Sequence, residues 1–333
     1  MKRILFMVLV LIAGILPLSC ASMVINLVSD ALTGTGSSAV FTGDPDINLV
    51  GDALPFAIKM YEALLAQNPN HQGLILTTGS LFVMYANAYV QGPADMLPRS
   101  AYSERETARS RAKQLYLRGT ELLFRGLEQR FPGFGEALKA GDIARFLPRV
   151  KKEDVPLIYW TVAGTLSAFA LNPMDLELGM KIQPLAALIN RAYELDPDYD
   201  RGTLDDFFIL FHSSIPVYLG GDPVRVPEHF RLAVEKSGGL SASPYVSYAE
   251  AVCIPAGDYE GFRENLERAL AIDVNAGPEN RLVNLIAQRK ARYLLDNASY
   301  FFYFLDSAGE EGEFDWEDDG WGDEALEMDE TWR

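Results

Sequence analysis

The histidines and cysteines of this chain could form a catalytic or metal centre only at a suitable spacing. His71, His212 and His229 have no second histidine four residues later and no cysteine nearby, so the sequence contains no zinc-binding motif. It also contains no nucleophile elbow, P-loop or glycine-rich dinucleotide-binding motif. We therefore predict a protein that is not an enzyme and that holds no metal and no cofactor.

Two groups of aspartates are explained by local structure. Asp205 and Asp206 follow Thr203, and we expect them in the first turn of a helix, where carboxylates interact favourably with the helix dipole. The segment ELDPDYDRG (194–202) resembles a calcium loop only superficially, because it has no glycine at the sixth place and no glutamate at the twelfth. We interpret its aspartates as turn residues.

Aromatic side chains offer a different chemistry, the recognition of a ligand. The segments 72–94 and 155–174 contain no charged residue and combine aromatic with small residues. Tyrosine and tryptophan have polar tips that need a partner or water, and concave faces of helical repeat proteins are common binding surfaces. The alternative is that most of these side chains belong to the core. The candidate groove residues are Phe82, Tyr85, Asn87, Tyr89, Tyr159, Trp160 and Phe169.

Residues 74–90 form an almost wholly apolar segment that must be buried or cross a membrane. Gly79 and Ala86 allow close approach of neighbouring helices, and no basic anchor flanks the segment. We predict a central packed helix that ends at Gly92 and Pro93, with a membrane span as the alternative.

The segments 74–90 and 155–171 are expected to pack side by side and to line a passage through the subunit. Their small residues leave either close backbone contact or a gap between the helices. Asn87 is expected to be a buried amide, and leaving it without a partner would cost about 1–3 kcal/mol. A ligand, an ordered water or a backbone carbonyl would satisfy it.

A four-three spacing of apolar and small residues recurs along the chain, followed five residues later by proline or another loop residue. Steps of four and three stay on one face of a helix, and proline ends the helix. The pattern resembles the second helix of a tetratricopeptide repeat. The copies begin at Ala57, Thr120, Leu185, Val226 and Phe262. We predict an all-α fold over residues 52–305, a helical-hairpin solenoid of degenerate tetratricopeptide-like repeats; chance recurrence in an all-α protein is the alternative.

The N-terminus is similar to a bacterial lipoprotein signal. A basic start precedes the apolar segment 4–18, and a serine directly precedes Cys20. We predict a signal peptide over 1–19, lipid attachment at Cys20 and a tether over 20–51. Pro17 stands where the common motif has leucine, and an ordinary secretory signal is the alternative. Cys253 then has no disulfide partner, and we expect a small buried apolar residue there.

The net charge of −17 and the pI of about 4.6 exclude a basic surface for nucleic acid. The last 24 residues carry twelve Asp/Glu against one Arg, so most of the negative charge lies at the C-terminus. We predict a disordered, acidic and aromatic tail over 306–333.

Four long segments, in order, resemble the T component associated with TRAP (tripartite ATP-independent periplasmic) transporters. They are 79–98 (GSLFVMYANAYVQGPADMLP), 187–209, 237–255 and 281–295, and the similarity extends over residues 20–305. The resemblance implies a tetratricopeptide-like periplasmic lipoprotein, anchored to a bacterial membrane through its N-terminal lipid, that forms homotrimers. It also implies a TRAP-type periplasmic substrate-binding protein as partner and a small organic acid, hydrophobic in some cases, as ligand. The alternative function is a generic envelope scaffold without a small-molecule ligand.

Overall fold

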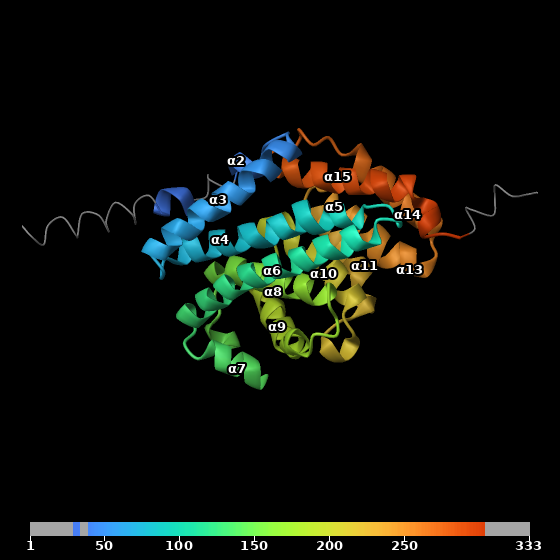
Figure 1. The fold of residues 1–333 in the computed structure, drawn as a ribbon. Helices are drawn as coiled ribbons and strands as arrows, with labels where there is room; N and C mark the ends of the chain where they lie inside the picture. Colours follow the sequence, from blue (N-terminus) through green and yellow to red (C-terminus); the bar gives the residue numbers. More distant parts are fainter. Residues whose placement is uncertain (1–28, 34–38, 304–333) are drawn as a thin grey trace, which may run out of the picture.

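The computed structural model describes residues 29–33 and 39–303, and every regular element in them is helical (Figure 1). The predicted all-α class is therefore confirmed. The predicted signal peptide, Cys20 and the acidic tail lie outside the described residues. The main helices are α2 (Ala39–Thr42), α3 (Ile47–Gln67), α4 (Gln72–Tyr85), α5 (Gly92–Asp95), α6 (Tyr102–Arg130), α7 (Phe134–Ala140), α8 (Val155–Ala170), α9 (Leu176–Leu195), α10 (Thr203–Ser214), α11 (Val226–Lys236), α12 (Ser243–Tyr248), α13 (Ile254–Ala256), α14 (Tyr259–Ala271) and α15 (Arg281–Asp296).

Helical structure begins earlier than the predicted end of the tether at residue 51. Residues 29–33 are helical, and α3 starts at Ile47. The start of α3 has a local cause, because the Asp46 carboxylate accepts hydrogen bonds from the backbone N–H groups of Asn48 and Leu49 at 2.9 and 3.0 Å. Part of the segment 20–51 is thus built into the fold.

Each copy of the four-three pattern lies on a helix, and its loop residue lies just beyond the helix end. These helices are α3, α6, α9, α11 and α14, and the apolar residues of the pattern face the interior. Four of the five pack against an earlier helix of the chain as hairpins: α4 with α6, α8 with α9, α10 with α11, and α12 with α14. The repeated spacing therefore located the buried helix faces correctly.

The last helix returns to the start of the chain. In Figure 1 the orange-red α15 lies beside the blue α2 and α3, and it contacts both helices. The Arg281 guanidinium donates to the Gly43 carbonyl at 2.9 Å, and Arg289 donates to the Ala88 carbonyl at 3.4 Å. The row of hairpins consequently closes on itself through contacts between its two ends.

The central apolar helix is present, and it does not end where we predicted. The helical run Gln72–Asp95 is long and apolar enough to cross a membrane by length and composition. In this fold, 56% of its most apolar 18-residue stretch is buried. After α4 it continues through the π-helix η1 (Ala86–Gln91) into α5, past Gly92 and Pro93. In the wider turn the Gly92 N–H reaches the Asn87 carbonyl. The Ala88 carbonyl, which would face the absent N–H of Pro93, accepts from Arg289 instead.

The change from an α-helix to a π-helix, followed by a short helix with a proline, occurs a second time in the chain. The segments SLFVMYANA (80–88) and SPYVSYAEA (243–251) share five identical residues in register. Both form an α-helix that widens into a π-helix, η1 or η7 (Ala249–Cys253), and both continue into a short helix that contains Pro-Ala. The two segments are an internal repeat that the four-three pattern did not reveal.

Small residues bring the backbones of neighbouring helices into contact. A Cβ atom on Gly79 of α4 would lie 2.5 Å from Leu123 Cγ and 3.0 Å from the Gly119 carbonyl oxygen of α6. A Cβ atom on Gly164 of α8 would lie 2.7 Å from Val83 Cγ2 of α4. The helices α4 and α8 therefore pack side by side as predicted, with the Val83 side chain against Gly164, while the backbones of α4 and α6 meet at Gly79 and Gly119.

We expect Gly79→Ala to lower the free energy of unfolding by about 1–3 kcal/mol, because the added methyl overpacks the contact with α6. The matched control is Gly179→Ala in α9, where the Cβ atom would make an ordinary contact of 3.6 Å with Phe169. That control should leave stability unchanged or raise it by up to about 1 kcal/mol. Urea unfolding followed by circular dichroism measures both, and equal stability of the two variants would show that α4 and α6 do not require glycine at their contact.

Candidate functional site

One stripe of polar residues and a methionine on the central helix run is accessible along its length. Steps of three and four residues keep its members on one helix face. The stripe consists of Thr77, Ser80, Met84, Asn87 and Gln91, which are half-buried except for Asn87, which is exposed. The expected burial of the Asn87 amide is therefore wrong.

Polar side chains connect the stripe to α6 and α8. The Tyr116 hydroxyl of α6 donates to Gln91 Oε1 at 2.8 Å. Burial raises the pKa of Tyr116 to about 12, while the side chains of Asn87 and of Ser167 on α8 act in the opposite direction. Ser167 is half-buried and belongs to an accessible stripe on α8 that also contains Tyr159 and Trp160. We call these accessible stripes of α4–η1 and α8 the inner face.

Aromatic rings continue the inner face from α8 towards α10. The Tyr159 ring lies 5.1 Å from that of Trp160, 5.7 Å from that of Tyr199 and 6.2 Å from that of Phe207, measured between centroids. Tyr199 begins the 3-10 turn η4 (Tyr199–Arg201) between α9 and α10, and Phe207 lies in α10. All four rings are half-buried, and together they form an aromatic wall that is partly exposed.

The turn that presents Tyr199 is strained. Asp200 and Arg201 have φ angles of 43° and 56°, a left-handed conformation that residues with a side chain seldom adopt, and Gly202 follows at 96°. The Thr203 hydroxyl donates to the Asp200 carboxylate at 3.2 Å and helps to hold the turn. The interpretation of this segment as a turn is confirmed, and strained turns of this kind cluster at functional sites.

Asp206 in the first turn of α10 adds a carboxyl group beside the aromatic wall. Its Oδ2 accepts a hydrogen bond from Ser243 Oγ of α12 at 2.5 Å, whereas its buried Oδ1 has no partner among the described residues. Burial raises the pKa of Asp206; Ser243 and Ser247 act against this, and Asp205 adds to it. The groups that lower its pKa are thus two neutral serines of α12.

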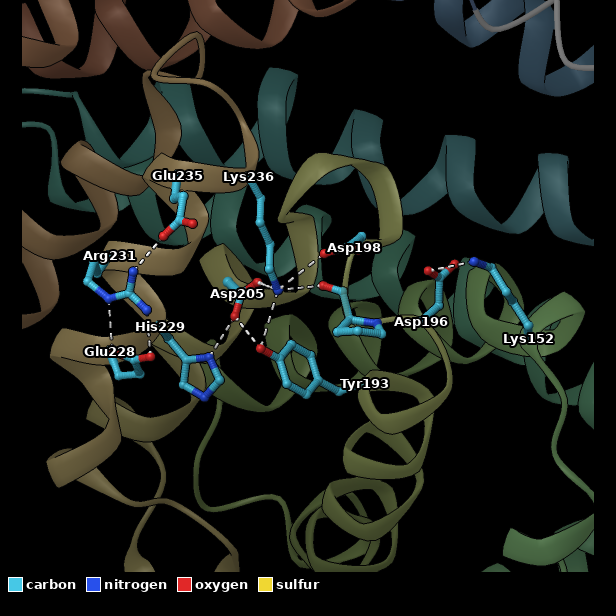
Figure 2. A network of polar contacts seen from close by, with 11 residues as sticks. Lys152, Tyr193, Asp196, Asp198, Asp205, Glu228, His229, Arg231, Glu235 and Lys236 are labelled. Atoms are coloured by element: carbon cyan, nitrogen blue, oxygen red, sulfur yellow. Dashed lines mark hydrogen bonds and ion pairs between the residues drawn. The ribbon is translucent and has the colours of Figure 1, made fainter.

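Asp205, the preceding residue, has the opposite environment (Figure 2). It is fully buried, and it accepts from the Tyr193 hydroxyl at 2.7 Å and from Lys236 Nζ at 2.7 Å, while His229 Nδ1 lies 2.9 Å away. Burial raises the pKa of Asp205, but the hydrogen bonds from His229, Lys236 and Tyr193 outweigh it and lower the pKa overall. These partners come from α9 and α11, so Asp205 joins three helices and serves the structure.

The candidate groove residues do not all come together. Asn87, Tyr159 and Trp160 belong to the inner face, whereas Phe82 is buried beneath the Arg118 guanidinium of α6. Phe169 contacts α9 at Gly179.

Tyr85 and Tyr89 stack on each other with their centroids 5.9 Å apart, and Tyr89 lies against Gly51 of α3. Burial raises the pKa of Tyr89 to about 12. The sequence patterns did not reveal Tyr199, Asp206 and Ser243 as site residues: turn and first-turn positions explained the aspartates of 196–206, and no motif joined the three residues.

The described residues contain no group of three or more His, Cys, Asp or Glu that could hold a metal ion. Cys253 is buried as predicted, and burial raises the pKa of its thiol to about 11, so the thiol stays protonated near neutral pH.

Two comparisons with known proteins extend over most of the chain. A family model described as TRAP transporter T-component matches residues 43–302. An uncharacterized protein of Treponema pallidum (strain Nichols) is 36% identical over 274 residues, which cover 81% of this chain and 85% of that protein.

Proposed function

This chain belongs to the TRAP transporter T-component family and serves in TRAP transport, and we propose that it does so by binding a TRAP-type periplasmic substrate-binding protein. In this proposal it assists the uptake of a small organic ligand and catalyses no reaction. The observation that carries the proposal is the family match over residues 43–302, which takes in every main helix from α3 to α15.

The arrangement of the helices supports a repeat protein that presents a binding face. We propose that the four hairpins are degenerate tetratricopeptide-like repeats stacked as a solenoid, because the copies of the four-three pattern fall on their second helices. Solenoids of this type bind partners and ligands through continuous concave surfaces. The inner face, with its polar stripe and aromatic wall, is the surface that we assign to the ligand.

The proposed location is the periplasm, with the chain anchored to a bacterial membrane through a lipid on Cys20 and assembled as a homotrimer. Membrane association follows from the role in TRAP transport, whereas the lipid, the compartment and the trimer rest on the sequence of the N-terminus and on the resemblance.

Affinity capture from solubilised membranes tests the proposed function. The full-length tagged chain should retain the substrate-binding protein encoded with the same transporter, and it should not retain an unrelated periplasmic binding protein. Cys20→Ser should move the chain to the soluble fraction without abolishing capture, because the anchor lies outside the repeat domain. Light scattering of the purified chain measures whether it is trimeric. Failure to capture the cognate binding protein, with membrane association intact, would contradict the proposal.

A further inference from the structure

We propose that the acidic C-terminal segment 304–333 binds to its own chain along α6, where three arginines form a row beside a cleft between α3 and α6. The arginine row consists of Arg111, Arg118 and Arg125. The contact lies outside the inner face and goes beyond the proposed function, on which it does not depend. The fold thereby offers a binding surface to a segment whose composition alone predicts disorder.

The arginine row follows from the spacing of its members. Steps of seven residues make about two helical turns, so the three side chains leave α6 on one face, about 10.5 Å apart along the axis. All three are exposed. The Arg111 guanidinium lies 5.8 Å from the ring centroid of Tyr85, and that of Arg118 lies 4.6 Å from the ring centroid of Phe82. The rings of α4 therefore support two of the guanidinium groups and leave them accessible.

A cleft of about 260 Å³ lies beside the arginine row. It is lined by Glu62 of α3 and by Arg118, Glu121, Leu122 and Arg125 of α6. Arg118 pairs with Glu62 at 2.8 Å, whereas Arg111 and Arg125 make no ion pair with another described residue. Residues 99–130 carry eight Lys/Arg against four Glu, in a chain whose net charge is −17. The helix α6 is thus a locally basic part of an acidic protein, and it attracts acidic segments.

The described chain ends beside the start of α6. Arg99, three residues before that helix, donates to the Tyr300 carbonyl at 2.8 Å, and its guanidinium lies 4.6 Å from the centroid of the Tyr300 ring. From the start of α6, Arg111 and Arg125 lie about 14 and 35 Å along the helix axis. The segment 304–333 can span up to about 100 Å when extended, so it reaches every member of the row.

The sequence of the segment complements the arginine row. Twelve Asp/Glu against one Arg lie between 310 and 333, and aromatic residues, among them Phe314 and Trp316, are interleaved with them. Neighbouring arginines of the row are separated by the length of about three extended residues. Every three consecutive residues from 310 to 319 include at least one carboxylate. Carboxylates form charge-assisted hydrogen bonds with guanidinium groups and aromatic rings stack on them, so both residue types of the segment find partners on the row.

Tryptophan fluorescence tests this contact, because Trp316, Trp321 and Trp332 lie in the segment and the fourth tryptophan is Trp160. In the full chain with Trp160→Phe, all of the fluorescence comes from the segment. Raising NaCl from about 50 mM to about 1 M should increase quenching by acrylamide about twofold, because salt screens the ion pairs that hold the segment. The unaltered chain should show the same change on top of a constant contribution from Trp160. Quenching that does not depend on salt would overturn the proposal.

Substitutions in the arginine row locate the contact. Replacing all three arginines with glutamine should give the high quenching already at low salt. Arg125→Gln alone should give part of the increase, and it removes no hydrogen bond or ion pair of the described residues.

The matched control removes the same charge elsewhere on the surface. It replaces Lys139, Arg145 and Arg149, which are exposed cations of α7 and of the loop after it, with glutamine. This control should keep the low quenching and its salt dependence. Circular dichroism verifies that the variants retain their helices. Protection of the tryptophans that persists without the arginine row, or that is lost to the same extent in the control, would contradict the assignment of the segment to α6.

Discussion

Replacing Asp205 with alanine is expected to lower the free energy of unfolding by about 3–5 kcal/mol, the range for breaking a buried ion pair by removing one partner. The Asp205 side chain is 0% exposed, and its two oxygens are the shared acceptors for Tyr193, His229 and Lys236. Without it, Lys236 loses its buried counter-ion, and the contacts that join α10 to α9 and α11 are lost together. Urea unfolding of the two proteins near neutral pH measures the difference.

Two further variants distinguish the buried network from a general effect of charge. Asp198 also faces Lys236, at 3.8 Å, but its side chain is 80% exposed, and Asp198→Ala should therefore cost less than about 1 kcal/mol. Adding Lys236→Met to Asp205→Ala should recover part of the lost stability, since it removes the uncompensated charge. A loss for Asp205→Ala as small as that for Asp198→Ala would show that this network does not hold the three helices together.

Lowering the pH from 7 to about 4 is expected to destabilise the protein by roughly 3 kcal/mol through His212 alone. The side chain is 1% exposed, and neither ring nitrogen has a hydrogen-bond partner in the described residues. Burial, together with the charges of Arg225 and His229, lowers the pKa of His212 from 6.5 to about 4. The unfolded chain therefore takes up a proton near pH 6.5, while the folded chain takes it up only near pH 4. The stability is complete above pH 6.5 and is lost progressively as the pH falls towards 4.

His212→Phe should remove this pH dependence. The imidazole stacks on the ring of Phe208, with centroids 5.0 Å apart, and makes no hydrogen bond within the described residues that the benzene ring would lose. We expect the variant to be about as stable as the native protein at pH 7 and more stable at pH 5. Asp205 provides an internal reference, because its lowered pKa confines its own loss of stability to pH values below its ordinary 3.8. Identical pH profiles of the two proteins between 7 and 4 would refute the role of His212.

The positions of the helices were predictable because they depend on local periodicity. Apolar residues at steps of three and four define a face that must be buried, and the copies of this pattern fall on α3, α6, α9, α11 and α14. The end of the central helix was not predictable in this way. At Pro93, which has no backbone N–H to donate, the Ala88 carbonyl accepts instead from Arg289, which lies about two hundred residues later in the chain.

The composition of the candidate site depended on the packing of helices that are distant in the sequence. Tyr159 and Trp160 were predicted as polar-tipped aromatics, and the structure places them on the inner face beside Tyr199. Phe82 had the same appearance in the sequence and lies in the core, because α6 covers its side of the helix. Whether a side chain is exposed depends on which helix packs against it, and a local sequence pattern contains no information about that helix.

The sequence by itself determined the helical class, the buried helix faces and, through four long segments, the likeness to a transporter family. Only the tertiary structure separated the adjacent carboxylates Asp205 and Asp206. Their side chains leave the first turn of α10 about 100° apart around the helix axis, so one points to Tyr193 of α9 and Lys236 of α11 and the other to the serines of α12. The same residue type in the same turn therefore forms a buried ion pair at one position and has neutral serine partners at the next, because a carboxylate acquires its role from the charges that its neighbours bring to it.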